Sequence, residues 1–292
     1  MAGLRRRALF HLATNPLYER AILATPPLRA RARSGARRYV GGESLQEAVA
    51  VVRALDAHGL GASLDLFGEG VSDPGHAARV AGAYVELAGA LGATPPATQL
   101  AIDLSHIAFD AGHLARIAAA LPPGRLLQVG AEQAATADRV HAAVLRAHAD
   151  GLPVSATLQA NLRRSAGDAD RLAGAGIPVR LVKGAYVEPG GAALPYGAPT
   201  DRAYAELARR LAAAYGDGGR GAKVALATHD DALRAPLLDA LPEAVCELLL
   251  GVHPERARAL RAAGRTVRIY VPFGPSWLRY VLRRRAEAQR TG

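Results

Sequence analysis

The sequence is poor in cysteine, lysine and aromatic residues, and it has no long apolar run. Cys246 is the only cysteine among 292 residues, which excludes an intramolecular disulfide and a cysteine-based metal cluster. No apolar stretch approaches the ~20 residues that a membrane-spanning helix requires. The arginine-rich start leads into an apolar stretch that Asn15, Tyr18 and Glu19 interrupt, so it does not match a secretory signal. These absences predict a globular, cytoplasmic protein.

The formal net charge of +10 does not by itself indicate a nucleic-acid partner. Lys183 and Lys223 are the only lysines, and the arginines are spread through an alanine-, glycine- and leucine-rich chain. Only 5% of the residues are aromatic, so surfaces for stacking bases are scarce. We expect no nucleic acid as a partner; a basic module binding nucleic acid or membrane would depend on charge alone. The one basic cluster, either solvated or in contact with an anionic membrane surface, comprises Arg29, Arg31, Arg33, Arg37 and Arg38.

Eight short aliphatic runs recur along the chain, and stretches with helical spacing separate them. The runs span residues 62–66, 99–104, 125–129, 154–158, 179–182, 223–227, 245–250 and 266–271. They are continuously apolar, as expected for parallel strands that are buried on both faces. We expect Pro272 and Gly274 to stop the last run. The pattern predicts an α/β fold: a (β/α)8 TIM-like barrel over residues 61–292, with an N-terminal helical segment at residues 1–60 flanking it.

In such a barrel the chemistry lies at the carboxyl ends of the strands. The residues at or just after these ends are Asp65, Glu69, Asp103, Ser105, Gly130 to Gln133, Gln159, Asn161, Lys183, Gly184, Tyr186, Thr228, His229, Asp230, Gly251 and Tyr270. They predict a polar ring around one mouth of the barrel. Lys183 belongs either to this ring or to an internal ion pair. Thr228, His229 and Asp230 form either a hydrogen-bonding cluster for a polar ligand or a helix N-cap.

The last predicted helix carries a pair of adjacent arginines. Tyr280, Arg284 and Glu287 are spaced i, i+4 and i+7, so they share one face, and Arg283 lies about 100° around the helix from Arg284. Two neighbouring guanidiniums suit bidentate capture of a carboxylate or a phosphate. The alternative is a solvated basic helix end, which the helix dipole favours.

Other common sites are not supported. No G-x-G-x-x-G follows a strand and no G-x-x-x-x-G-K-[ST] is present, so the sequence predicts neither a Rossmann dinucleotide site nor a P-loop. His106 and His113 lie seven residues apart, and we interpret them as packed or surface histidines rather than metal ligands.

Taken together, the strand ends and the last helix resemble the proline dehydrogenase family, flavin-dependent (β/α)8 enzymes of proline catabolism. The matching stretches occur in the family's order and are residues 64–69, 158–164, 179–186, 227–230, 250–252 and 270–274, followed by Tyr280, Arg283, Arg284 and Glu287. The most specific parts are Lys-Gly-Ala-Tyr at residues 183–186 and the spacing from Tyr280 to the arginine pair.

The resemblance implies non-covalent FAD at the barrel mouth. The residues that match the family's flavin contacts are Gln159, Arg180, Val182, Lys183, Ala185, Thr228, His229 and Glu287. Arg283 and Arg284 match a clamp for the proline carboxylate, and Tyr270, Tyr280 and Tyr186 match the walls of the ring pocket. The implied reaction removes a hydride from the carbon beside the amine of L-proline or a related small amino or imino acid, giving an imine. Electrons would pass to a quinone or another acceptor, which implies contact with the inner face of a membrane.

The chain departs from the family at the centre of the implied site. Asp103 stands where the family has a lysine, Gly130 where it has an aspartate, and Val187 where it often has a bulky or basic residue. Loss of the lysine and the aspartate together avoids leaving one buried charge unpaired. Asp103 then either repels a substrate carboxylate or faces the substrate amine. We therefore expect Asp103, Arg283, Arg284, Tyr270 and Tyr280 to be the catalytic set; the alternative is a non-catalytic descendant that binds flavin or a carboxylate.

Overall fold

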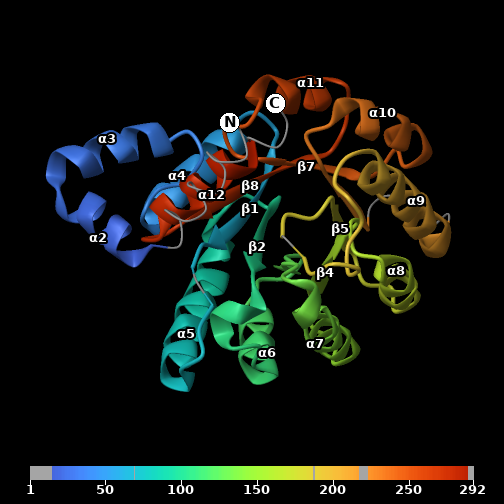
Figure 1. The fold of residues 1–292 in the computed structure, drawn as a ribbon, viewed down its shortest axis with the longest axis horizontal. Coiled ribbons are helices and arrows are strands. Elements are labelled where there is room, and N and C mark those ends of the chain that lie inside the picture. Colours follow the sequence, from blue (N-terminus) through green and yellow to red (C-terminus); the bar gives the residue numbers. More distant parts are fainter. Residues whose placement is uncertain (1–14, 69, 187, 217–222, 289–292) are drawn as a thin grey trace.

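The computed structural model describes residues 15–68, 70–186, 188–216 and 223–288. Eight parallel strands follow one another in sequence order and close into a barrel (Figure 1), which confirms the predicted fold class. The strands are β1 (Gly61–Leu66), β2 (Thr98–Ile102), β3 (Leu127–Val129), β4 (Val154–Gln159), β5 (Val179–Val182), β6 (Val224–Ala227), β7 (Val245–Leu249) and β8 (Val267–Phe273).

The strands are largely buried because the helices cover their outer face and the barrel interior covers the other. All six residues of β4 are buried, for example. The barrel closes between β1 and β8, whose register runs from Gly61 opposite Arg268 to Leu66 opposite Phe273. The carboxyl ends of all eight strands therefore point to the same mouth.

Two strands differ from the prediction by two residues at their carboxyl ends. β8 continues through Pro272 to Phe273, so Pro272 does not stop it. The proline carbonyl accepts a hydrogen bond from the Gly41 amide at 2.7 Å, and β7 has already ended at Leu249 opposite Tyr270, so no ladder bond needs the missing proline N–H. β2 ends at Ile102, earlier than expected.

A ring of helices surrounds the barrel (Figure 1). After β1 to β7 come α5 (Pro74–Ala90), α6 (Ala111–Ala119), α7 (Ala137–Ala149), α8 (Ser165–Gly174), α9 (Ala198–Tyr215), α10 (Asp231–Ala240) and α11 (Pro254–Ala262), with short 3₁₀ turns η1 (Leu91–Ala93), η2 (Leu104–Ile107) and η3 (Ala134–Thr136). Aspartates cap several of these helices: the side chains of Asp73, Asp110 and Asp230 each accept a backbone amide of the first turn.

The N-terminal part of the chain covers the remaining side of the barrel. α4 (Leu45–Asp56) packs against β1 and β8, whereas α12 (Trp277–Ala288), which follows β8, packs against α3 (Pro26–Ala36). With α2 (Pro16–Ala24), α3 and α12 build a second apolar core, in which Trp277 is buried. None of the helices in the described part of the chain combines the length and apolarity needed to cross a bilayer.

Candidate active site

The barrel mouth gathers the polar residues that follow the strands. Asp65 lies in β1, Asp103 and Gly130 come directly after β2 and β3, and Gln159 ends β4. Lys183 follows β5, the Thr228–Asp230 stretch follows β6, and Tyr270 lies in β8. Glu69 and Val187, which the sequence also singled out, lie outside the described residues. Among the described residues, no group of three or more histidine, cysteine or carboxylate side chains is arranged to hold a metal ion.

A buried carboxylate and two tyrosines form the centre of the mouth. Asp65 is 4% exposed, and it accepts a hydrogen bond from the Tyr270 hydroxyl through Oδ2. The Tyr84 hydroxyl, from α5, lies 3.3 Å from Asp65 Oδ1 and 2.9 Å from the Leu66 carbonyl oxygen. His106 is also buried, with Nδ1 3.4 Å from the same hydroxyl. The Asp65 carboxylate thus fixes one aromatic ring from β8 and one from the helix outside β1.

The electrostatics of this cluster follow from its burial. Burial raises the pKa of the Asp65 carboxyl, although His106, Tyr270 and Arg180 act in the opposite direction. Burial and the negative charge of Asp65 raise the pKa of Tyr84 and of Tyr270 well above their ordinary values. Both tyrosines are therefore protonated hydrogen-bond donors at neutral pH.

Asp103 occupies space that any side chain at position 130 would need. A Cβ atom built on Gly130 would lie only 1.8 Å from Asp103 Oδ1. The half-buried carboxylate therefore lies directly against the end of β3. Its charge contributes to the raised pKa of Tyr84 and of Tyr270, so it acts on the same cluster as Asp65.

Arg180 lies inside the barrel as one partner of a buried ion pair. Its Nε and one terminal nitrogen donate to the two oxygens of Glu247 in β7 at 2.9 and 2.5 Å. The same guanidinium lies 3.2 Å from Ser63 Oγ and 5.8 Å from the centre of the Tyr270 ring. A terminal nitrogen of Arg268 lies 4.0 Å from Glu247 Oε2. The Arg180 charge is thus compensated within the barrel.

Lys183 is held by two carboxylates at the mouth. Its Nζ lies 2.6 Å from Asp201 of α9 and 2.9 Å from Asp230, the N-cap residue of α10. Burial alone would lower the pKa of Lys183, but the two carboxylates raise it above its ordinary value. Of the two interpretations left open by the sequence, the structure shows an ion pair, which nevertheless lies at the mouth and not inside the barrel.

His229 is a neutral hydrogen-bond donor. Its Nε2 accepts a hydrogen bond from the Leu249 amide at 3.1 Å, so the ring proton lies on Nδ1. Burial, with nearby His253 and three arginines, lowers the pKa of His229 to about 4. Within the described residues Nδ1 is buried and has no hydrogen-bond partner. The neighbouring residues match the N-cap interpretation: Asp230 caps α10, and Thr228 Oγ1 accepts the Asp230 amide at 3.1 Å.

The remaining predicted residues of β4 and β5 lie around the same rim. The Gln159 amide nitrogen donates to the Glu132 carbonyl at 2.7 Å. Val182 is half-buried and Ala185 is exposed. Between these strands, the buried Asn161 Oδ1 has no hydrogen-bond partner among the described residues, and a Cβ atom on Gly184 would lie 1.9 Å from it.

Helix α12 extends the aromatic side of the mouth. Tyr280 is buried, with its ring centre 5.3 Å from that of Phe67 and 6.4 Å from that of Tyr270. The Arg284 guanidinium lies 5.5 Å from the Tyr280 ring centre, and its charge helps to lower the pKa of His229. The structure therefore brings Arg284, Tyr280 and Tyr270 together. The side chains of Arg283 and Glu287 lie outside the described residues.

Tyr84 and Glu247 contact the candidate site residues but are not among the residues predicted from the sequence. Glu247 had a detectable signal, because it is an acidic residue within a continuously apolar run, and Arg180 is a basic residue within another. Two opposite charges in buried strands of one barrel favour an internal ion pair. Tyr84 had no comparable signal. A tyrosine fits on the apolar face of a helix, and the sequence does not show which residue its hydroxyl contacts.

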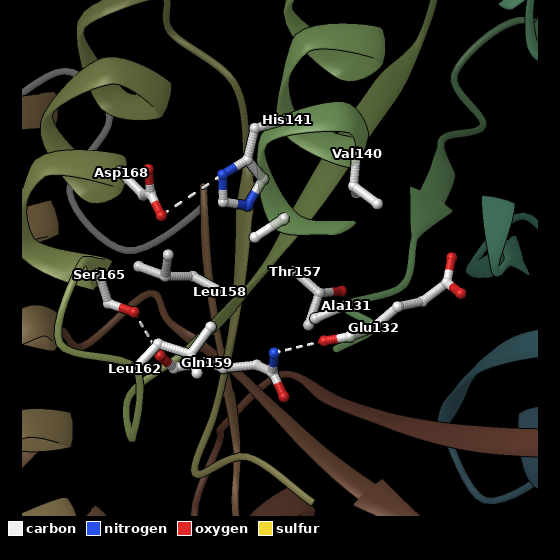
Figure 2. A pocket seen from close by; sticks show the side chains of 11 residues that line it. Ala131, Glu132, Val140, His141, Thr157, Leu158, Gln159, Leu162, Ser165 and Asp168 are labelled. Carbon is white, nitrogen blue, oxygen red and sulfur yellow. Dashed lines mark hydrogen bonds and ion pairs between the residues drawn. The ribbon is translucent and has the colours of Figure 1, made fainter. Parts of the chain in front are cut away.

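A small cavity outside β4 contains a further polar network (Figure 2). His141 of α7 and Asp168 of α8 point toward one another, with Nδ1 and Oδ2 3.6 Å apart (Figure 2). Asp168 also accepts hydrogen bonds from Arg164 at 2.7 Å and from Arg171 at 2.6 Å. Burial lowers the pKa of His141 despite the neighbouring carboxylate. This network fastens α7 and α8 to each other behind β4.

Comparisons with known proteins identify relatives over most of the chain. Residues 48–291 match the model of the family described as proline dehydrogenase. Proline dehydrogenase 1 from Bacillus subtilis strain 168 is 28% identical over 269 residues, which cover 87% of each chain. Proline dehydrogenase from Deinococcus radiodurans is 31% identical over 300 residues, which cover 94% of this chain and 95% of the relative.

A solved structure has the same fold. Proline utilization A from Bdellovibrio bacteriovorus, inactivated by N-propargylglycine, superimposes with a TM-score of 0.77 at 18% identity. The match covers 99% of this chain and 36% of the Bdellovibrio protein, so this chain spans little more than a third of that length.

Proposed function

Because the chain belongs to the proline dehydrogenase family of oxidoreductases, we propose that it oxidises L-proline or a related small cyclic amino acid at the C–N bond to an imine. FAD is the proposed cofactor. The observation that supports this most directly is the composition of the mouth. The guanidinium of Arg284, a cation able to bind a carboxylate, lies over the Tyr280 ring, and Tyr270 continues that wall toward buried Asp65.

The residues at the rim fit a flavin. A flavin ring presents hydrogen-bond acceptors and a donor along one edge, and the rim holds a buried donor and a buried acceptor without partners in the described part of the chain. These are Nδ1–H of His229 after β6 and Oδ1 of Asn161 after β4. Leaving such atoms unpaired in a buried site is costly, so a ligand that pairs with both would be favoured. Gly184, with a φ of +107°, also lets the backbone approach closely between them.

We assign the flavin contacts to the residues that the sequence identified. They are Gln159, Arg180, Val182, Lys183, Ala185, Thr228, His229 and Glu287. Bound there, FAD would supply the hydride acceptor for the carbon beside the substrate amine. Lys183 stays protonated because two carboxylates hold it, so it offers a fixed cation at the rim. His229 stays neutral and donates through Nδ1.

The substrate side of the mouth is assigned to β8 and α12. Arg284, with Arg283 beside it in the sequence, binds the substrate carboxylate, and the rings of Tyr270 and Tyr280 cover the apolar face of the substrate and exclude water. Asp65 positions Tyr270 by accepting its hydroxyl proton in a hydrogen bond. The charge-assisted pairing of guanidinium and carboxylate fixes the orientation of the substrate.

A quinone at a membrane surface is the proposed electron acceptor. Arg31, Arg37 and Arg38 are exposed on and just after α3. A basic surface of this kind is attracted to anionic lipid. This part of the proposal rests on charge and is tested by comparing a soluble quinone with a quinone in anionic vesicles.

An anaerobic titration tests the proposal. The purified protein should show the visible absorbance of bound flavin, and L-proline or a cyclic analogue should bleach it. Arg284→Gln should raise the substrate concentration needed for half of the bleaching, while the flavin stays bound. Arg258→Gln, which changes an exposed arginine of α11, should leave that concentration unchanged. Protein that takes up no FAD contradicts the proposal. Bound flavin that no cyclic amino acid bleaches would favour the non-catalytic, ligand-binding descendant.

A further inference from the structure

The carboxylate of Asp103 and the absence of a side chain at Gly130 form one structural unit. A Cβ atom on Gly130 would lie 1.8 Å from Asp103 Oδ1 and 3.1 Å from its Cγ. The Gly130 amide donates to the Ile102 carbonyl at 2.8 Å, so the two strand ends cannot move apart without breaking a ladder bond. Gly130 does not have a positive φ. The position therefore uses glycine for space and not for backbone conformation.

Opposite charges are separated around the mouth. The carboxylates of Asp65 and Asp103 lie on one side of the aromatic wall, and the Arg284 guanidinium lies on the other. Asp65 accepts the Tyr270 hydroxyl, and the Asp103 charge also acts on Tyr270. The Tyr280 ring lies 6.4 Å from that of Tyr270, and the Arg284 guanidinium lies beyond, 5.5 Å from the Tyr280 ring centre. A zwitterionic amino acid has complementary charges: its negative carboxylate suits the Arg284 side and its positive ammonium suits the aspartate side.

We propose that Asp103, lying in the space left by Gly130, binds the ammonium of the substrate while Arg284 binds its carboxylate, so that residues 103 and 130 together select zwitterions. This inference rests on the proposed function for the position of the substrate at the mouth and for its carboxylate contact with Arg284. It explains why an acidic residue can be accommodated beside a carboxylate site: the negative charge faces the amine end of the ligand and not its carboxylate end.

Two ligands separate this role from a general effect on the site. L-Proline carries the ring, the carboxylate and the ammonium, and cyclopentanecarboxylate carries the same ring and carboxylate without the nitrogen. Affinities are measured by calorimetry on the purified protein, with any bound flavin reduced by dithionite beforehand so that proline binds without turnover. The variants are Asp103→Asn, Asp103→Ala, Gly130→Ala and the double variant Asp103→Ala/Gly130→Ala. Gly82→Ala on α5, where no atom lies within 4 Å of the added carbon, is the control.

The proposal predicts opposite responses to the two ligands. Asp103→Asn should weaken proline binding by about 10- to 100-fold, the value of one hydrogen bond to a charged group, and it should leave cyclopentanecarboxylate binding unchanged or stronger. Gly130→Ala should weaken proline binding similarly, because the added methyl displaces the carboxylate. The same change should have almost no further effect in the Asp103→Ala background, where nothing remains to displace.

The outcomes distinguish this inference from the proposed function. If wild-type flavin is bleached by proline but Asp103→Asn binds proline as tightly as wild type, or loses both ligands equally, the inference is wrong and the function stands. If proline binding depends on Asp103 but no bleaching occurs, the inference stands and the proposed oxidation is wrong. Wild-type protein that binds no proline contradicts both. Should Gly130→Ala fail to fold, the ligand pair measured on Asp103→Asn decides alone.

Discussion

Replacing Glu247 by alanine should destabilise the barrel more than almost any other single polar substitution. Glu247 is 4% exposed, and it holds Arg180 through two hydrogen bonds of 2.9 and 2.5 Å across the barrel interior. Arg268 lies 4.0 Å from the same carboxylate, and burial lowers the pKa of that arginine. Glu247→Ala therefore removes the carboxylate that both guanidiniums approach.

The expected loss follows from the asymmetry of buried ion pairs. Removing one partner of such a pair costs about 3–5 kcal/mol because the other charge stays buried, whereas replacing both partners by apolar groups of similar volume is often nearly neutral. We therefore expect Glu247→Ala to lower the free energy of unfolding by roughly this amount. The double variant Arg180→Met/Glu247→Leu should recover the part of the loss that comes from Arg180, whereas Arg268 still lacks the carboxylate.

Urea denaturation followed by circular dichroism measures these differences. The control is Asp170→Ala, which breaks an ion pair of the same bidentate geometry: Arg210 donates to the two Asp170 oxygens at 2.5 and 2.6 Å. Both side chains are 50% exposed, so water replaces the lost partner and the change should be far smaller. Equal losses for Glu247→Ala and Asp170→Ala would refute the argument from burial.

Three further predictions concern the mouth. The pKa of His229 is about 4 in the folded protein and 6.5 when unperturbed, so between pH 4 and 6.5 the unfolded chain binds a proton on this residue that the folded chain does not. The free energy of unfolding should therefore fall by roughly 3 kcal/mol from this group as the pH drops from 6.5 to 4, and His229→Asn should lack that part of the slope in pH-dependent denaturation. Tyr84→Phe should cost about 1–3 kcal/mol in the same assay, because it removes the hydrogen bonds of a buried hydroxyl; an unchanged urea midpoint would contradict this. Gly184→Ala should cost at least ~1–3 kcal/mol, because φ is +107° and the new carbon would lie 1.9 Å from Asn161 Oδ1; Gly190→Ala in the same loop, with nothing within 4 Å, should be nearly neutral in thermal denaturation.

The fold could be predicted from the sequence because burial on both faces leaves a simple pattern. Each of the eight strands lies within or overlaps an apolar run, and the limits of β5 are those of the run at residues 179–182. The predicted ends of β8 and β2 are wrong because contacts with distant parts of the chain, and not the apolar pattern alone, decide where a strand ends. Pro272 is compatible with β8 because its missing N–H has no strand opposite, and the run at 99–104 includes two residues that leave the strand after Ile102. Such details depend on neighbours that are distant in the chain.

The gathering of the candidate residues at one mouth could be predicted, but their pairing with one another could not. The topology alone brings Lys183, His229 and Tyr270 to one mouth, because they follow or lie in parallel strands. Which charges compensate one another depends on side-chain geometry. Arg180 was identified as a cofactor contact, yet it lies against Glu247, a residue 67 positions away in the chain. The steric dependence of Asp103 on Gly130 is equally invisible in the sequence, because a glycine gives no sign of whether it serves conformation or space.

These ion pairs determine which charged side chains can offer a net charge to a ligand. A guanidinium with both oxygens of a buried carboxylate against it, as in Arg180, presents little net charge. Lys183 is compensated by Asp201 and Asp230 in the same way. Arg180 inside the barrel and Lys183 at its mouth thus have compensated charges, since unpaired buried charges would destabilise the fold. In the proposed site, selectivity then comes from groups close to the ligand, and we expect the aspartate beside Gly130 to decide what binds.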